Sequence, residues 1–269
     1  MSATAIRRTV LAASAVSLAL VVTACGGGEQ GGEDKQAKGG TTSTSDKPAA
    51  KTLTAAELEK LVVAQGDVEG HKITKPGKAD VFAPGSVSVE KAECDAVGQV
   101  LSALPAGKPT ATVQRLVVQE SEASKKGMPS MEELAEMTEK EAEEATLDSL
   151  DITKTMTSLW SYEDDGAEQT LATLREAGKK CAGGFAMTID GEKQQVTKVS
   201  EEKLTAGEDA VAWTVGTTQD GSAGETKVVV FRQGATLAGF SSFNIAAVTR
   251  GEAFEQPTAV VEAQATKLG

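Results

Sequence analysis

The sequence has few aromatic residues and a single histidine. Its 269 residues include two tryptophans, one tyrosine and six phenylalanines, so a folded core must consist mainly of valine, leucine, alanine and isoleucine. A Ser-His-Asp or Cys-His catalytic group would have to use the sole histidine, His71. This residue follows Gly70 in an expected loop or strand start, and the chain has no GxSxG motif. We therefore predict no catalytic residue and a protein that is not an enzyme.

Motifs that bind metals or phosphates are missing as well. The three cysteines form no CxxC pair and have no zinc-binding spacing, and no DxDxDG calcium loop occurs. Of the glycine-rich stretches, residues 26–28 belong to a polar linker and residues 182–184 end an expected helix, so neither predicts phosphate binding. The glutamates of residues 130–147 would diverge along a helix and are expected to be solvated. The sequence predicts neither a metal site nor a cofactor.

There is only one long apolar run, and it lies at the N-terminus. Residues 10–22 follow two arginines, are too few to span a bilayer comfortably as a helix, and have the length of a signal-peptide core. The run ends in Val22-Thr23-Ala24-Cys25, which resembles the lipobox of bacterial lipoproteins, with valine where leucine is usual. This pattern predicts a signal peptide over residues 1–24 and lipidation of Cys25, with acyl chains such as palmitate. The alternative is an ordinary secretory signal with a cysteine nearby by chance.

Basic residues are fewer than acidic ones, with 27 lysines and arginines against 39 aspartates and glutamates. The formal net charge is −12, and cleavage before Cys25 would remove two arginines and no acid, so the mature chain would carry −14. Such acidity argues against a nucleic-acid partner and against electrostatic binding to anionic lipid headgroups. Residues 25–50 are expected to be the lipidated cysteine and a flexible tether, and each buried methylene of the acyl chains would contribute about 0.8 kcal/mol. The expected location is the extracellular face of the cell membrane, with lipid as the anchor.

Two cysteines remain after Cys25 is assigned to lipid. In an oxidising compartment, pairing of Cys94 and Cys181 is the default. Each lies on the apolar stripe of an expected helix, the first at residues 88–104 and the second at residues 165–181. We predict a disulfide between Cys94 and Cys181, and the alternative is two separate buried thiols.

Residues 51–269 are expected to form a single α+β domain with a largely antiparallel sheet. Hydrophobic periodicity marks its elements, together with capping boxes at Thr54/Glu57 and Ser130/Glu133 and turns at Asp190-Gly191 and Gln233-Gly234. The expected helices are residues 54–62, 88–104, 130–147, 165–181 and one that opens at Pro257. The expected strands are residues 71–74, 111–120, 153–162 and a late five-strand meander between 185 and 245. We expect the helices at 88–104 and 165–181, and the terminal helix, to pack on one buried face of the meander.

Three stretches carry a family resemblance. They are a helix that follows a Trp/Tyr strand and ends in cysteine (SYEDDGAEQTLATLREAGKKC), a late pair of apolar strands (VVVFRQGATLAGFSSFNI), and the closing Ala/Val helix. Over residues 50–269 they resemble the extracellular sensor domain of the actinobacterial serine/threonine kinase PknH and the free-standing lipoproteins that share it. The resemblance implies a mixed sheet with helices around a ligand-binding cleft. Related domains carry two disulfides, and a tryptophan where this chain has Lys179 and Lys180, so no binding residue is transferred.

The leading hypothesis for function is a non-enzymatic ligand-binding or sensing module on the cell surface. The alternatives are a carrier of lipid or small molecules in the envelope, and a hydrolase with an unrecognised site. We expect a ligand to sit between the sheet and the helices rather than on the acidic helix 130–147. Trp160, Tyr162 and Trp213 are large amphipathic side chains that could line such a site, and the alternative is that all three belong to the core.

Replacing Cys25 with alanine is expected to release the protein from the membrane. The thiol is the predicted lipid attachment point, and the sequence has no second long apolar segment. Detergent-phase partitioning of wild type and Cys25→Ala measures this. A variant that still partitions with membranes would contradict the lipobox interpretation.

Overall fold

The computed structural model describes residues 50–219 and 221–269. The predicted signal peptide and Cys25 lie outside the described residues, as does nearly all of the predicted tether. The described part belongs to one compact unit that reaches to Gly269. Within it, no helix is long and apolar enough to cross a membrane.

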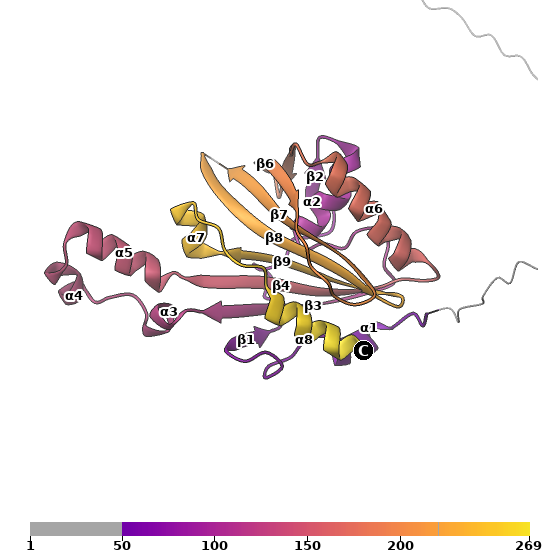
Figure 1. Ribbon diagram of the computed structural model, residues 1–269, viewed down its shortest axis with the longest axis horizontal. Coiled ribbons are helices and arrows are strands. Elements are labelled where there is room, and N and C mark those ends of the chain that lie inside the picture. The colour runs from indigo at the N-terminus through magenta and orange to yellow at the C-terminus, as the bar shows by residue number, and fades with distance from the viewer. Residues whose placement is uncertain (1–49, 220) are drawn as a thin grey trace, which may run out of the picture. The chain divides into compact units, whose positions relative to one another are not determined.

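A nine-stranded antiparallel sheet forms the body of this unit, in the order β1-β3-β4-β9-β8-β7-β6-β5-β2 (Figure 1). This confirms the predicted α+β class and the late meander, and it shows that the early strands join the same sheet. The strands are β1 (His71–Thr74), β2 (Val87–Val89), β3 (Ala111–Glu120), β4 (Ile152–Ser161), β5 (Phe185–Ile189), β6 (Glu192–Glu201), β7 (Asp209–Gln219), β8 (Ser222–Gln233) and β9 (Thr236–Asn244).

Eight α-helices and one short 3-10 helix accompany the sheet in the described residues. They are α1 (Ala55–Leu61), η1 (Ala92–Cys94), α2 (Asp95–Leu101), α3 (Glu122–Lys126), α4 (Met131–Glu136), α5 (Glu139–Ser149), α6 (Gly166–Lys180), α7 (Ile245–Arg250) and α8 (Thr258–Leu268).

Local signals in the sequence explain several boundaries. Thr54 and Glu57 form the predicted capping box of α1. Asp190 and Gly191 turn β5 into β6 with φ values of +50° and +89°, the left-handed conformation that a two-residue hairpin needs. Asp165 stands at the start of α6 as predicted, but its side chain makes no capping hydrogen bond.

Two predicted helices were wrong in detail. Residues 87–89 are not helical; they form β2, which pairs with β5, and the helical segment begins only at Ala92. A pairing partner a hundred residues away overrides the local helical pattern there. The helix predicted over 130–147 is two helices, because Met137 is extended and Thr138 and Glu141 form a second capping box that starts α5.

The sheet is buried on both faces rather than on one. Along β8, Val228 and Val230 belong to one core cluster, whereas Val229 and Phe231 belong to another on the opposite face. Helices α2 and α6 pack on the first face, as predicted, but α8 packs on the second together with α1. The prediction that the terminal helix shares the face of α6 is therefore wrong, since a continuous apolar strand needs cover on both sides.

The predicted disulfide between Cys94 and Cys181 is confirmed, with the two Cα atoms 5.8 Å apart. Cys94 ends η1 directly before α2, and Cys181 is the C-cap of α6. Both side chains are almost fully buried in the first core cluster. The bond therefore ties the two helices of this face to each other.

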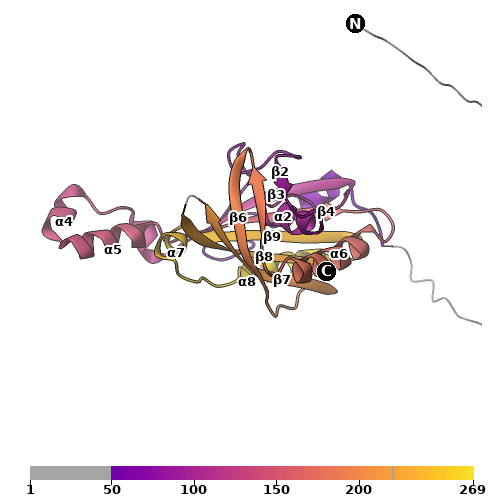
Figure 2. The same ribbon diagram turned by 90° about the horizontal axis from the view of Figure 1, so that it is seen from above.

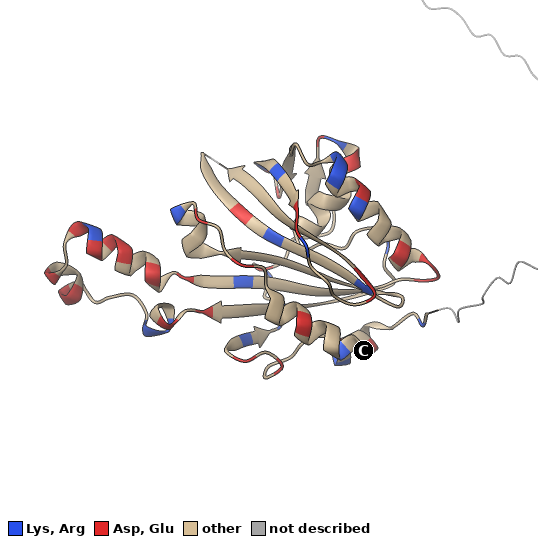
Figure 3. Cartoon of the chain, viewed as in Figure 1, with Lys and Arg blue, Asp and Glu red and all other residues tan. Residues whose placement is uncertain are grey.

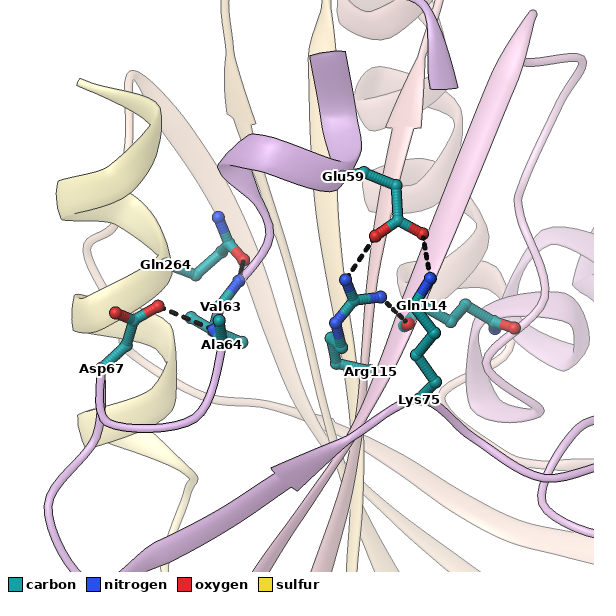
Figure 4. Close-up of polar contacts among 8 residues, drawn as sticks. All are labelled: Glu59, Val63, Ala64, Asp67, Lys75, Gln114, Arg115 and Gln264. Atoms are coloured by element: carbon teal, nitrogen blue, oxygen red, sulfur yellow. Dashed lines mark hydrogen bonds and ion pairs between the residues drawn. The ribbon is translucent and has the colours of Figure 1, made fainter. Parts of the chain in front are cut away.

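On the opposite face, polar contacts hold α1 and α8 in place (Figure 4). The fully buried Gln264 of α8 accepts a hydrogen bond from the Val63 amide at 3.0 Å and donates one to the Leu61 carbonyl at 2.9 Å. Glu59 of α1 binds the Arg115 guanidinium on β3, which holds the pKa of that carboxyl below its usual value. Gln264 and Arg115 are buried polar side chains that find partners, so these bonds fix where each helix sits.

A close approach between the central strands depends on one glycine. A Cβ built on Gly239 of β9 would overlap the Trp160 ring, which is almost fully buried. Gly183, in the turn after α6, has open space around its would-be Cβ and no positive φ. Neither glycine has a positive φ, so a Cβ at Gly239 meets a clash that a Cβ at Gly183 does not.

Gly239→Ala is expected to lower the free energy of unfolding by about 1–3 kcal/mol, because the added methyl overpacks the core. The matched Gly183→Ala should be neutral or stabilise by up to about 1 kcal/mol, because it restricts the unfolded chain without a clash. Chemical denaturation of both variants measures this difference. Equal stability of the two would contradict the packing of Trp160 over Gly239.

Candidate functional site

A cleft with a volume of about 580 Å³ lies where α2 ends over the sheet. That size is typical of small-molecule sites. Five regions line it: the loop before β2, the C-terminus of α2, strands β3, β4, β8 and β9, the β5–β6 hairpin, and the end of β7. The lining residues are Ala79, Asp80, Phe82, Leu101, Ser102, Ala103, Leu116, Lys154, Met156, Ile189, Asp190, Glu192, Gln194, Gln219, Thr226, Ser241 and Phe243.

The pairing register of β3, β4 and β9 determines which residues form the floor of this cleft. Met156 of β4 stands opposite Leu116 of β3 and Ser241 of β9. In the next row on the same face, Lys154 stands opposite Phe243. Directly opposed residues on one face have Cβ atoms about 5 Å apart. The floor is therefore a row of Leu116, Met156 and Ser241 beside a row that pairs an ammonium with a phenyl ring.

The wall formed by α2 is held by side chains from the sheet. The Ser241 hydroxyl donates to the Leu101 carbonyl at 2.7 Å, and Gln114 donates to the Ala103 carbonyl at 2.8 Å. These bonds satisfy carbonyls that the end of a helix leaves unpaired. Between them Ser102 is only 6% exposed, and its hydroxyl has no partner among the described residues.

Two aromatic side chains are unusually exposed at the cleft. Phe82 is 39% and Phe243 is 41% exposed, although Phe243 belongs to a central strand. Three residues away on the same strand, Phe240 is 1% exposed and packs in the second core cluster against Phe231. The phenyl ring of Phe243 therefore offers apolar surface to the cleft that no part of the described chain covers.

Charge in the cleft is distributed unevenly. Lys154 supplies the only cationic side chain of the lining, and its ammonium has no ion pair or hydrogen bond among the described residues. The Asp80 carboxylate is occupied by the Gly77 amide at 2.8 Å. Asp190 and Glu192 are exposed at the β5–β6 turn. Among the described residues, the arrangement gives one unpaired cation on the floor and two unpaired carboxylates at the hairpin.

Trp160, Tyr162 and Trp213, the residues proposed from sequence as possible ligand contacts, lie elsewhere. They are 1–3% exposed in the first core cluster and do not line this cleft. The Tyr162 hydroxyl donates to the Ala106 carbonyl at 2.7 Å, and burial raises the pKa of Tyr162 above its usual value. The structure thus places all three in the core, the alternative considered from sequence.

Lys154, Phe243 and Met156 are not marked as a group by any local sequence pattern. Each lies at an ordinary position of its strand. Their proximity depends on the β4–β9 register, which local sequence does not encode. The one available signal was Phe243 itself, an aromatic residue at the end of an apolar strand.

His71 is half-buried at the start of β1, beside a smaller cleft of about 230 Å³ near the start of α8. Its Nδ1 lies 2.7 Å from the Glu69 carbonyl oxygen. No carboxylate or hydroxyl side chain is bonded to its ring in the described part of the chain. Over residues 50–219 and 221–269, no group of three His, Cys, Asp or Glu residues is arranged to hold a metal ion.

Comparison with known proteins shows a similarity to a solved structure. The sequence matches no protein-family model and no curated protein. The extracellular domain of PknH from Mycobacterium tuberculosis is similar in structure, with a TM-score of 0.49 and 10% sequence identity, over 82% of this chain and 98% of that one. It is a domain of the kind that the sequence motifs resemble. At such low identity no residue of that domain is equated with one of this chain.

The two phenylalanines of β9 give a test of the cleft. Phe243→Ala should lower the free energy of unfolding by about 1 kcal/mol or less, since the ring is 41% exposed. Phe240→Ala should cost about 3–5 kcal/mol, because it empties a filled core position. Thermal or chemical unfolding of both variants measures this. A large loss from Phe243→Ala would show that this ring is structural and would remove it from the site.

Proposed function

We propose that this protein is a non-enzymatic ligand-binding module of the cell envelope, held at the outer face of the membrane by lipid on Cys25. The observation that carries the proposal is the pairing of Lys154 with Phe243 on the floor of the cleft. A lysine without a partner and a half-exposed phenyl ring side by side on central strands contribute little to folding. They form a surface suited to a small amphipathic molecule.

The chemistry of the cleft favours a ligand with an apolar body and one negative charge. The apolar part would contact Phe243, Met156 and Phe82, and the anionic group would bind the Lys154 ammonium. Ser102, also in the lining, has a buried hydroxyl without a partner among the described residues. Asp190 and Glu192 at the hairpin would repel a multiply charged anion such as a nucleotide, so a single carboxylate fits better.

A lipid carrier is the second candidate, because half of the lining is apolar, including Leu101, Leu116 and Ile189. The open, mixed character of the cleft supports a binding or sensing role over long-term carriage of a lipid. A hydrolase has less support, since His71 lies outside this cleft and its ring contacts a backbone carbonyl rather than a carboxylate.

Calorimetry of decanoate and decanol binding separates the contribution of the ligand's charge from that of its apolar contacts. Wild type should prefer decanoate, and Lys154→Met should weaken decanoate binding about tenfold while leaving decanol unchanged, because one charge-assisted hydrogen bond is lost. Phe243→Ala should weaken both ligands. Lys198→Met, which removes an exposed lysine of β6 outside the cleft, is the matched control.

No binding of either ligand to wild type would remove the proposed ligand class. Native mass spectrometry of protein isolated from its own host then tests the module itself. A co-purified molecule that is lost in Phe243→Ala but kept in Lys198→Met would support the cleft. An empty protein in every preparation would count against ligand binding.

A further inference from the structure

Residues 121–151 form an arm that leaves the sheet between β3 and β4. The two strands pair until Glu120 meets Ile152, and the chain between them carries α3, α4 and α5. Both views show α4 and α5 at the far end of this arm, beyond the end of the sheet (Figure 1, Figure 2). The arm is therefore a projecting segment that packs on little of the sheet.

The base of the arm is fixed to the body. Asn244 donates to the Asp151 carboxylate at 2.8 Å, and Arg250 of α7 pairs with Asp148 at 2.6 Å. The Ser121 amide donates to the Asp151 carbonyl at 3.1 Å, which closes the neck where the two strands end. These bonds give the arm a defined direction.

The outer part of the arm is held by local bonds rather than by a core. No residue of α4 is buried, and α5 buries only Ser149 near the base. Ser130 with Glu133 and Thr138 with Glu141 form two complete capping boxes, whose hydrogen bonds hold the pKa of both glutamates below the usual value. Such short helices are marginal without packing. The capping bonds therefore stabilise a segment that contributes almost no buried side chain to the core.

Methionines carry the apolar surface of this outer part. Met128 is 61%, Met131 is 81% and Met137 is 36% exposed, and with Leu134 they follow one another at intervals of three residues. The chain's other described methionines, Met156 and Met187, are 7% and 3% exposed. Exposed methionines are adaptable contact groups that suit varied apolar partners.

The same segment is strongly acidic (Figure 3). Residues 128–147 contain seven glutamates and one basic residue, Lys140. The ion pairs of the whole arm in the described structure are Glu122–Lys125 and Asp148–Arg250, both nearer its base. Five glutamates therefore have neither an ion pair nor a capping role: Glu132, Glu136, Glu139, Glu143 and Glu144.

We propose that residues 128–147 are a docking arm for a basic amphipathic segment of another protein. The methionines would contact its apolar side chains, and the free glutamates would pair with its lysines and arginines. Charge complementarity selects this occupant. Anionic lipid would be repelled, and a second copy of this acidic chain would be repelled too, because its net charge is −12.

A synthetic amphipathic helix of leucine and lysine is the probe, with a leucine–glutamate helix as the peptide control. The lysine peptide should bind the wild-type protein and the glutamate peptide should not, and added salt should weaken the binding. A methionine variant and a charge variant of the arm should each bind about tenfold more weakly. The methionine variant is Met128→Ser, Met131→Ser and Met137→Ser, and the charge variant is Glu132→Gln, Glu136→Gln, Glu143→Gln and Glu144→Gln.

A matched variant distinguishes a specific arm from general acidity. It removes the same charge from exposed glutamates of η1, α6, β6 and α8: Glu93→Gln, Glu168→Gln, Glu201→Gln and Glu262→Gln. This variant should bind the lysine peptide as wild type does. Equal weakening in the matched and charge variants would overturn the proposal.

Methionine oxidation locates the contact independently of affinity. With hydrogen peroxide and mass spectrometry, the bound lysine peptide should slow oxidation of Met128 and Met131 several-fold and leave the buried Met187 unchanged. Unchanged oxidation of Met131 at saturating peptide would place the contact elsewhere and overturn the proposal. Far-ultraviolet circular dichroism of each variant confirms that the sheet is retained, and the result does not depend on the cleft.

Discussion

The constraint on which the structure depends is a sheet whose central strands are apolar on both sides. Val228, Val229, Val230 and Phe231 follow one another in β8 and are all fully buried. Each face therefore needs its own cover, and the chain provides it from distant segments: α2 and α6 on one side, α1 and α8 on the other. The Cys94–Cys181 bond and the buried Gln264 are the specific contacts that hold these two covers in place.

The cleft follows from incomplete cover of one face. Helix α2 is short and ends at Leu101, where Ser241 and Gln114 bind the last carbonyls from the sheet below. Beyond that point the strands continue without a helix above them, so Lys154 and Phe243 stay accessible. These bonds lie where the helix ends, and the floor beyond that point is open because no helix covers it. The site is therefore part of the fold itself.

Structural features that depend on a few neighbouring residues could be predicted from the sequence, whereas features that depend on pairing across the sheet could not. The Thr54/Glu57 box, β1, β3 and the Asp190-Gly191 turn were predicted correctly because each is decided locally. The second box at Thr138/Glu141 was equally present in the sequence and was overlooked. By contrast, β2 exists because β5 pairs with it, and the cleft floor exists because of the β4–β9 register, so a linear pattern could indicate neither.

The two candidate surfaces are built in opposite ways, and this bears on what each can do. The floor of the cleft is formed by side chains of the paired strands β3, β4 and β9, so this floor is fixed before a ligand arrives and costs little ordering on binding. The arm is held by capping boxes and a few bonds at its base, with exposed methionines that can change rotamer freely. A preformed cleft suits one small molecule, whereas an adaptable acidic arm suits a protein segment whose sequence can vary. Because no core residue is shared between them, a change in one should leave the other intact.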